Sequence, residues 1–343
     1  MTLTVVVANM KDDSLAVLVE DVRKKFKSYE TKHGQGILSS IRRQYIIKQA
    51  LNGVSFSVKK GEIVALLGKN GSGKSTMIKV LTGVLHPDSG TIRVLGMDPW
   101  ISRETLAMRI GVVFGAHEQL YWNLPALDTF QFRKALYGIS DDEFKRRVRY
   151  LVGVLELEKV YKRQVRELSL GERMKCNFAA SLLHMPEVVF LDEPTIGVDL
   201  PSSFALRDAL FDMNKRFGTT FIIATHIIDD IKILAKRTII LDNGSVIYDG
   251  TNQGISKMFG DYREVTAYLK GSTKLPHLSG VRTLERTKDY IKFSIPGKMI
   301  KDKRLGAFLS SDKVADYSIA EPDFGITLHQ FYKKRASDHG SKD

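Results

Sequence analysis

Lys74 and Ser75 close a glycine-rich octet suited to holding phosphate in this 343-residue sequence. The octet, residues 68–75, follows the strand-like apolar run 62–67 and precedes the helix-like run 76–81. Such a turn leaves backbone N–H groups free to surround phosphate oxygens at a helix N-terminus. The Lys74 ammonium would contact the β- and γ-phosphates, and the Ser75 hydroxyl would ligate Mg²⁺. The pattern predicts an ATP site formed by Gly68, Lys69, Asn70, Gly71, Ser72, Gly73, Lys74, Ser75 and Thr76.

An acid pair, Asp192 and Glu193, ends a second apolar run at residues 188–191. A short continuous apolar run is typical of a buried parallel strand, and its carboxyl end would lie beside the phosphate loop. There Asp192 would hold Mg²⁺ through water, and Glu193 would act as general base near the γ-phosphate. The pair could instead cap a helix before Pro194, but the phosphate loop favours the catalytic interpretation.

Between these motifs, residues 168–173 read Leu-Ser-Leu-Gly-Glu-Arg, and here the chain resembles the ABC family of ATPases. The family signature is usually Leu-Ser-Gly-Gly-Gln, so the chain keeps Ser169 and Gly171 and differs at Leu170 and Glu172. We expect a helix start whose Ser169 hydroxyl and Gly171 N–H point outward. The resemblance implies that these four residues contact ATP held by a second cassette. The working unit would be a head-to-tail pair, either a homodimer or a heterodimer with a related cassette.

Two further segments follow the family's order along the chain. Residues 197–199 read Gly-Val-Asp and look like the loop that couples the two ATP sites, which implies a role for Asp199. His226 follows the apolar run 220–224 and looks like the family's switch histidine. A neutral imidazole there would bond the γ-phosphate and orient Glu193 and the attacking water. The predicted catalytic residues are therefore Lys74, Glu193 and His226.

Two contacts to the nucleotide have competing candidates. Phe26 matches the family's aromatic residue that stacks on adenine, although Phe26 could be a core residue and Tyr29 competes for the role. Gln119 is the nearest match to the glutamine of the family's glutamine loop, and His117 is its competitor.

The amino-acid sequences of four segments resemble, within this family, the ATPase subunits of bacterial type-2 ABC exporters. These segments are residues 95–100, 120–128, 165–171 and 180–186. The resemblance implies export of a hydrophobic or amphiphilic substrate through separate permease chains, with residues 120–122 at the permease groove or in the core. One alternative is a cassette for polysaccharide or teichoic-acid-type polymers, which also carries a basic insertion and a C-terminal domain. Another is a soluble ABC ATPase acting on ribosomes or nucleic acid; such proteins usually carry two cassettes or long insertions.

Composition agrees with a peripheral protein on the cytoplasmic face of the cell membrane. The hydrophobic content of 43% supports a sizeable core, and no run approaches the roughly 18–20 apolar residues of a membrane span. The first residues lack the pattern of a signal peptide. The single cysteine, Cys176, excludes an intrachain disulfide and a multi-cysteine zinc site, and its apolar neighbours predict burial.

The formal net charge is +13, and much of the positive charge is concentrated in residues 22–48. Such a segment could contact the anionic leaflet or a membrane partner, bind RNA, or form a solvated face. No aromatic and glycine pattern of an RNA-binding module accompanies it, which argues against nucleic acid as a partner.

These motifs predict an α/β fold, namely a P-loop ABC nucleotide-binding domain with a mixed sheet core and a helical subdomain. We expect a disordered leader over 1–14, the ATPase domain over 15–260 and a small α+β accessory domain over 261–343. Within the ATPase domain, a basic insertion spans 27–48 with a short amphipathic segment, and helical periodicity marks the subdomain over about 115–183. In the accessory domain we expect strands near 265–269, 290–295 and 314–319 and a last helix over 326–334.

Overall fold

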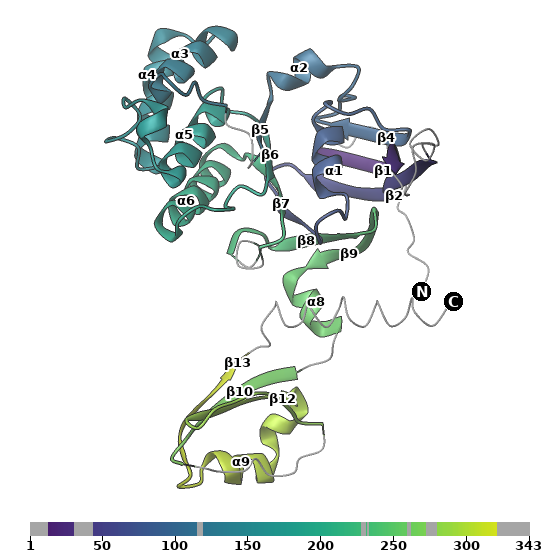
Figure 1. The fold of residues 1–343 in the computed structure, drawn as a ribbon, viewed down its shortest axis with the longest axis vertical. Helices are drawn as coiled ribbons and strands as arrows, with labels where there is room; N and C mark the ends of the chain where they lie inside the picture. Colours follow the sequence, from purple (N-terminus) through teal and green to yellow (C-terminus); the bar gives the residue numbers. More distant parts are fainter. Residues whose placement is uncertain are drawn as a thin grey trace, which may run out of the picture. The chain divides into compact units, whose positions relative to one another are not determined.

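The computed structural model describes residues 13–30, 44–114, 119–227, 231, 233–258, 262–271 and 280–320. The chain forms two compact units, residues 1–249 and residues 250–343 (Figure 1). This division falls before the predicted boundary at residue 260, because α8 (Asn252–Met258) groups with the second unit. Most of the predicted leader, the middle of the basic insertion and the predicted last helix lie outside the described residues.

A six-stranded sheet forms the centre of the first unit, with the strand order β5-β6-β7-β3-β8-β9. Its strands are β3 (Ile63–Leu67), β5 (Ile110–Phe114), β6 (Val188–Asp192), β7 (Thr220–Thr225), β8 (Arg237–Asp242) and β9 (Ser245–Thr251). From β5 to β8 all neighbours run parallel, so their carboxyl ends meet at one edge. Between β8 and β9, Asn243 and Gly244 have φ angles of 47° and 75°, the left-handed conformation typical of a two-residue hairpin turn.

The parallel strands are apolar on both faces because alternate side chains enter two different cores. On β7, Phe221 and Ile223 pack into one core, whereas Ile222 and Ala224 pack into the other. Successive side chains of a strand point to opposite faces, so a strand covered on both sides reads as a continuous apolar run. The apolar runs in the sequence therefore reflect the burial of this sheet on both of its faces.

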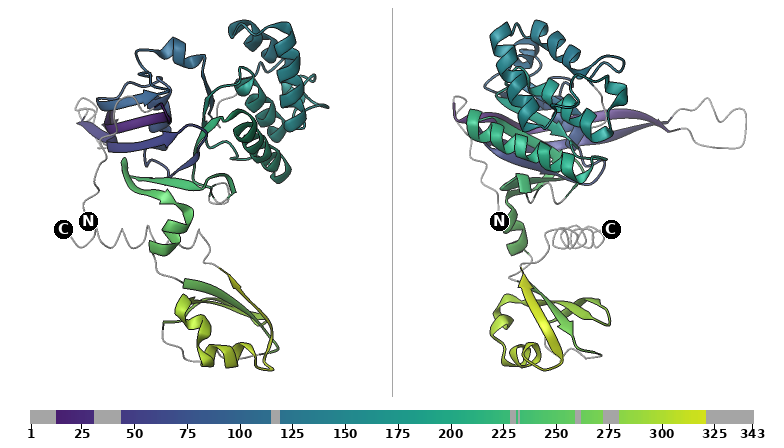
Figure 2. Two further views of the ribbon diagram at one scale, coloured as in Figure 1. Left: turned by 180° about the vertical axis from the view of Figure 1, so that it is seen from behind. Right: turned by 90° about the vertical axis from the view of Figure 1, so that its left-hand side faces the viewer.

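The first core joins the sheet to a helical subdomain. Its helices are α3 (Ala126–Leu136), α4 (Asp141–Val154), the short η2 (Val165–Glu167), α5 (Leu170–Leu182) and α6 (Leu200–Phe217). Figures 1 and 2 show these helices gathered on one side of the sheet. The predicted helical periodicity is confirmed in α3 and α4, but Phe132 and Leu136 are 50% and 56% exposed and form surface rather than core.

The second core lies between the other face of the sheet and a three-stranded antiparallel sheet with the order β2-β1-β4. These strands are β1 (Leu15–Glu30), β2 (Gln44–Lys59) and β4 (Ser89–Val94), and helices α1 (Lys74–Leu81) and α2 (Arg103–Ala107) belong to this side. β1 and β2 stay paired as far as Glu30 and Gln44. Tyr45–Ile47, where the sequence suggested a short amphipathic segment, continue β2 as one side of a long ribbon.

The second unit is a small α+β fold of its own. Its sheet has the order β11-β12-β10-β13 and consists of β10 (Tyr262–Leu269), β11 (Arg282–Arg286), β12 (Tyr290–Pro296) and β13 (Val314–Ala320). The turn η3 (Gly297–Lys301) and helix α9 (Lys303–Leu309) follow β12, and Phe293 packs with Leu305 in a separate core. The three predicted strands are confirmed. β11 and α9 were not predicted.

Two further expectations concern burial and membrane insertion. Cys176 is buried in α5, as predicted, and burial raises the pKa of its thiol to about 12. Within the described ranges, no helix combines the length and apolar character needed to cross a bilayer.

Candidate active site

The phosphate loop joins β3 to α1 and is shaped by its glycines. Gly71 and Gly73 adopt φ angles of 82° and 111°, a conformation that other residue types rarely take. A Cβ atom on Gly73 would lie 2.6 Å from the Ala50 carbonyl oxygen, so this position also requires glycine for space. α1 begins at Lys74 without a side-chain cap, which leaves its first backbone N–H groups available to an anion.

The Lys74 side chain is buried and folds back against the loop. Its Nζ donates hydrogen bonds to the carbonyl oxygens of Gly68 at 2.7 Å and Lys69 at 3.3 Å, and lies 3.7 Å from Glu193 Oε1. Burial lowers the pKa of Lys74, while the carboxylates of Glu193 and Asp192 oppose that change. The ammonium is therefore held inside the loop by two backbone oxygens and the Glu193 carboxylate.

A hydroxyl and a carboxylate meet where β6 ends. Ser75 Oγ donates a hydrogen bond to Asp192 Oδ1 at 3.1 Å. Burial raises the pKa of Asp192, and the hydrogen bond from Ser75 opposes that change. In the part of the chain that the structure describes, no cluster of three or more His, Cys, Asp and Glu side chains could form a metal cage. Two hard oxygens suit Mg²⁺, which usually takes one or two protein ligands and completes its shell with water and phosphate oxygens.

Glu193 and His226 form a pair at the ends of the neighbouring strands β6 and β7. His226 Nδ1 lies 2.8 Å from Glu193 Oε1, and the His226 backbone N–H donates to Glu193 Oε2 at 3.3 Å. The Glu193 backbone N–H donates to the Ala224 carbonyl at 2.8 Å, and Glu193 has a φ angle of 54°. A left-handed conformation in a glutamate is strained, and such strain is typical of functional sites. The backbone thus turns the carboxylate toward His226 and Lys74.

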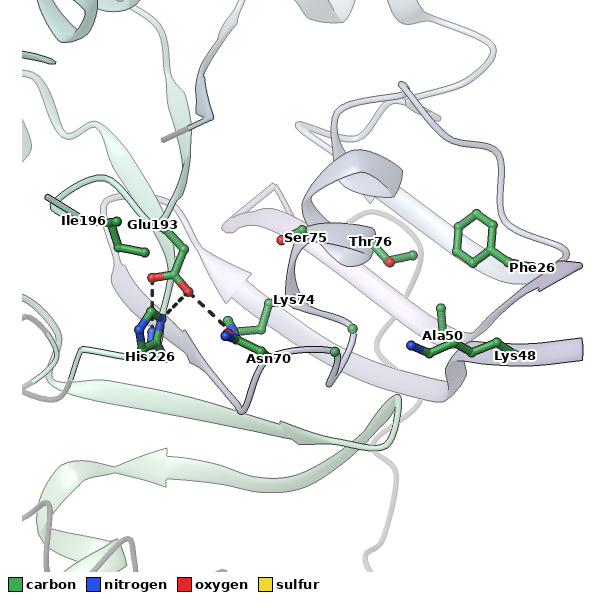
Figure 3. A pocket seen from close by; sticks show the side chains of 12 residues that line it. Phe26, Lys48, Ala50, Asn70, Lys74, Ser75, Thr76, Glu193, Ile196 and His226 are labelled. Carbon is green, nitrogen blue, oxygen red and sulfur yellow. Dashed lines mark hydrogen bonds and ion pairs between the residues drawn. The ribbon is translucent and has the colours of Figure 1, made fainter. Parts of the chain in front are cut away.

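These groups surround one pocket of about 430 Å³ (Figure 3). Its lining residues are Phe26, Lys48, Ala50, Asn70, Gly71, Gly73, Lys74, Ser75, Thr76, Glu193, Ile196 and His226. Figure 3 shows Glu193 and His226 at one end, Phe26 at the other, and Lys74 and Ser75 between them. Phe26 is 40% exposed, so its ring is open to a ligand and is not a core residue.

The sequence interpretation missed three lining residues, Lys48, Ala50 and Ile196. Lys48 and Ala50 lie on β2, and their position depends on the register of β2 against β1, which are separated in the sequence by residues 31–43. The side chain of the competing aromatic, Tyr29, is not described, but its backbone pairs with Tyr45 further along the ribbon.

The signature serine caps a helix in this chain. Ser169 Oγ accepts a hydrogen bond from the Glu172 backbone N–H at 3.2 Å, and the Ser169 N–H donates to Glu172 Oε2 at 2.8 Å. This reciprocal capping box begins α5. The expected helix start is confirmed, and the exposed Ser169 hydroxyl, whose oxygen accepts one bond here, keeps its hydrogen available to another group. Neither residue lines the pocket.

Gly171 packs against the loop that contains Asp199. A Cβ atom at Gly171 would lie 2.2 Å from Asp199 Oδ2 and 2.4 Å from Ser202 Oγ, so glycine is required there by close packing. Gly171 is buried, and the outward direction expected of its backbone N–H stays a prediction. Asp199 caps α6 by accepting the Ser202 backbone N–H at 2.9 Å, and this bond contributes most to lowering the pKa of Asp199. Leu170 lies against Gly197 and is half exposed.

Gln119 is placed away from the pocket, in the helical subdomain. Its Nε2 donates to the Val112 carbonyl at 3.0 Å, and its Oε1 accepts from Arg133 at 2.6 Å and from Ser181 at 3.3 Å. These bonds hold the amide in place and Gln119 does not line the pocket, so its contact with the nucleotide stays a prediction. The competing residue, His117, lies outside the described residues.

Three comparisons point the same way. A family model described as ABC transporter matches residues 51–196. The chain is 34% identical over 209 residues to the ABC transporter ATP-binding protein NatA of Bacillus subtilis, covering 61% of this chain and 85% of that protein. It is 32% identical over 252 residues to the linearmycin resistance ATP-binding protein LnrL of the same organism, covering 73% and 79%. The structure of cbiO1 from Clostridium perfringens, described as part of the ABC transporter complex cbiONQ, superposes with a TM-score of 0.59 and 28% identity, over 71% and 92% of the two chains.

Proposed function

Since this chain belongs to the ATP-binding proteins of ABC transporters, we propose that it drives export of a hydrophobic or amphiphilic substrate through separate permease chains. The chain is an ATPase of the ABC cassette type. The observation that carries the proposal for the site is the meeting of Lys74, Glu193 and His226 in one pocket, next to the Ser75–Asp192 pair. The substrate class, the direction of transport and the permease partner are proposals.

In the proposed mechanism, the phosphate loop and Lys74 hold the β- and γ-phosphates of ATP, and Phe26 stacks on adenine. Glu193 accepts a proton from the attacking water, and His226, bonded to Glu193 at 2.8 Å, fixes the orientation of that carboxylate. Mg²⁺, held by Ser75 and Asp192, would neutralise charge on the phosphate oxygens. Phosphate binding would also replace the carbonyl oxygens that hold the Lys74 ammonium in the present structure.

A complete site would need a second cassette. Ser169, Leu170, Gly171 and Glu172 lie outside the pocket of their own chain, and Ser169 and Leu170 are exposed. We therefore assign them, with Asp199, to contacts with ATP bound by a paired cassette, which can be a second copy or a related chain. The capping box leaves the Ser169 hydroxyl hydrogen available to donate to a γ-phosphate oxygen.

The permease contact is proposed at the exposed aromatic surface that precedes and includes α3. Tyr121, Trp122 and Phe132 are each close to half exposed, and the rings of Tyr121 and Phe132 meet edge to face at 5.9 Å. Exposed aromatic groups of this kind are enriched in protein interfaces. Export is favoured by the motifs of the exporter branch and by the similarity to a linearmycin resistance protein. Membrane association through the permease would place the chain on the cytoplasmic face.

The test is to purify the tagged full chain gently from detergent-solubilised membranes of its host and to identify the associated proteins by mass spectrometry. We expect a polytopic permease in stoichiometric amount. Vesicles containing the complex, with the cassette on the outside, should accumulate a fluorescent amphiphile when ATP is added. Vesicles with Glu193→Gln are the matched control and should not.

Ribosomal proteins or nucleic acid in place of a permease would overturn the transport proposal. A permease whose vesicles lose the amphiphile on addition of ATP would show import and overturn the proposed direction. A permease that moves a polysaccharide or teichoic-acid-type polymer, with no movement of amphiphiles, would overturn the proposed substrate class.

A further inference from the structure

Lys48 is a cation at the adenine end of the pocket that none of the sequence motifs includes. It lies on β2 directly opposite Phe26 on β1. Directly opposite residues of an antiparallel pair lie on the same face of the sheet, so both side chains reach the same pocket. The neighbouring pair, Lys27 and Ile47, lies on the other face of the ribbon. Of these two lysines, only Lys48 lines the pocket.

The Lys48 ammonium lies above the phosphate loop. A Cβ atom built on Gly71 would have Lys48 Nζ as its nearest neighbouring atom, at 4.0 Å. Figure 3 shows the Lys48 side chain starting near the strand that carries Phe26, with its nitrogen directed toward the loop. The ammonium thus lies between the aromatic ring and the glycines that surround phosphate.

The two lysines of the pocket differ in how their charges are compensated. Lys74 donates to two backbone carbonyls and has Glu193 at 3.7 Å. For Lys48, no carboxylate of the described residues lies within ion-pair distance of the ammonium. The uncharged side chain of Phe26 forms the pocket wall beside it. Its positive charge is therefore available to an anion that enters from the adenine end.

We propose that Lys48 is a second phosphate-binding cation of this site, which contacts the phosphate nearest the ribose. The proposal rests on the proposed nucleotide site, in which Phe26 marks the adenine and Glu193 with His226 marks the γ-phosphate. The phosphate nearest the ribose then lies on the Phe26 side of Lys74. Because AMP, ADP and ATP all carry that phosphate, Lys48 contributes to binding before reaction and not to the hydrolytic step.

The experiment compares Lys48→Met with Lys27→Met in the full chain. Methionine keeps an unbranched apolar side chain and removes the charge, and Lys27 is the matched lysine on the opposite face. Affinities for ADP and adenosine are measured by displacement of a fluorescent ATP analogue, and hydrolysis is measured over a range of MgATP concentrations. We expect Lys48→Met to weaken ADP binding about tenfold at low salt and less at high salt, since the contact is charge-assisted and partly solvated. Adenosine affinity should stay unchanged, and KM should rise while kcat does not.

Lys48→Arg should restore most of the ADP affinity, because a cation is again present. An unchanged ADP affinity in Lys48→Met would overturn the proposal, and so would equal losses for ADP and adenosine, which would indicate a packing effect. Equal weakening by Lys27→Met would also overturn it, since the effect would then come from the general charge of the ribbon. If the wild-type chain bound no ADP, the proposed nucleotide site would itself be wrong. That result differs from ADP binding that Lys48→Met leaves unchanged, which would contradict only the role of Lys48.

Discussion

The nucleotide pocket and the signature segment at the start of α5 both present polar side chains, but they satisfy them differently. In the pocket, Glu193 has a strained φ angle of 54°. The Ser72 hydroxyl, in the phosphate loop but not among the residues that line the pocket, is buried and lacks a hydrogen-bond partner in the described structure. In the signature segment, Ser169 and Glu172 bond to each other reciprocally. The pocket region therefore contains strained or unpaired groups, whereas the polar groups of the signature segment satisfy one another as a local helix start.

This difference indicates which groups a bound nucleotide would stabilise. Strained or unpaired groups persist where a ligand completes them, and the surrounding fold must supply the stability. The signature segment contributes to stability through its cap and keeps the Ser169 hydroxyl hydrogen available to a ligand. We therefore expect substitutions in the pocket to affect activity most, and substitutions at the signature to affect activity and stability together.

The largest effect is expected from Glu193→Gln. Glutamine keeps the size of the side chain and a hydrogen-bond acceptor but removes the general base, so kcat for ATP hydrolysis should fall at least about 100-fold while ATP binding persists. Steady-state hydrolysis and nucleotide affinity are the measurements. Glu187→Gln is the control, because Glu187 is an exposed acid paired with Arg109 outside the pocket. Normal hydrolysis by Glu193→Gln would show that another group is the base.

An intermediate effect is expected from mixing two inactive variants. Lys74→Ala removes the phosphate-loop cation, and Ser169→Arg blocks the signature segment, so each should be inactive alone. If the two regions act across a pair of chains, re-paired mixtures should recover roughly a quarter of the wild-type rate, since half of the pairs are mixed and each mixed pair keeps one complete site of two. If the mixture stayed inactive although cross-linking showed that mixed pairs had formed, both regions would belong to a site within one chain.

The smallest effect is expected for the capping role of Ser169. Ser169→Ala removes the capping oxygen and should lower the free energy of unfolding by about 1 kcal/mol, measured by chemical denaturation. Ser140 caps α4 in a similar way, accepting from the Glu143 backbone N–H, and Ser140→Ala is the matched control. Both variants should lose comparable stability, but only Ser169→Ala should lose hydrolysis. If both retain hydrolysis, Ser169 serves only as a cap.

Several elements were predictable because their patterns are local. The parallel strands were recognisable from apolar runs, since burial on both faces leaves no polar alternation. β11 was not, because residues 282–286 read Arg-Thr-Leu-Glu-Arg and the strand is largely exposed. Phe132 and Leu136 fit a helical pattern but lie on the surface, because periodicity shows which residues share a face and not what covers that face.

The sequence by itself determined the phosphate loop, since the glycines, Lys74 and Ser75 are contiguous and their backbone conformation is local. It also determined the acid pair at the end of β6, because the apolar run 188–191 marks a buried strand and the two acids follow it directly. The bond between Glu193 and His226 was decided only by the pairing of β6 with β7. In the same way, Lys48 lies opposite Phe26 only because of the register of β2 against β1. Register and strand order depend on packing between distant segments, and no local pattern encodes them.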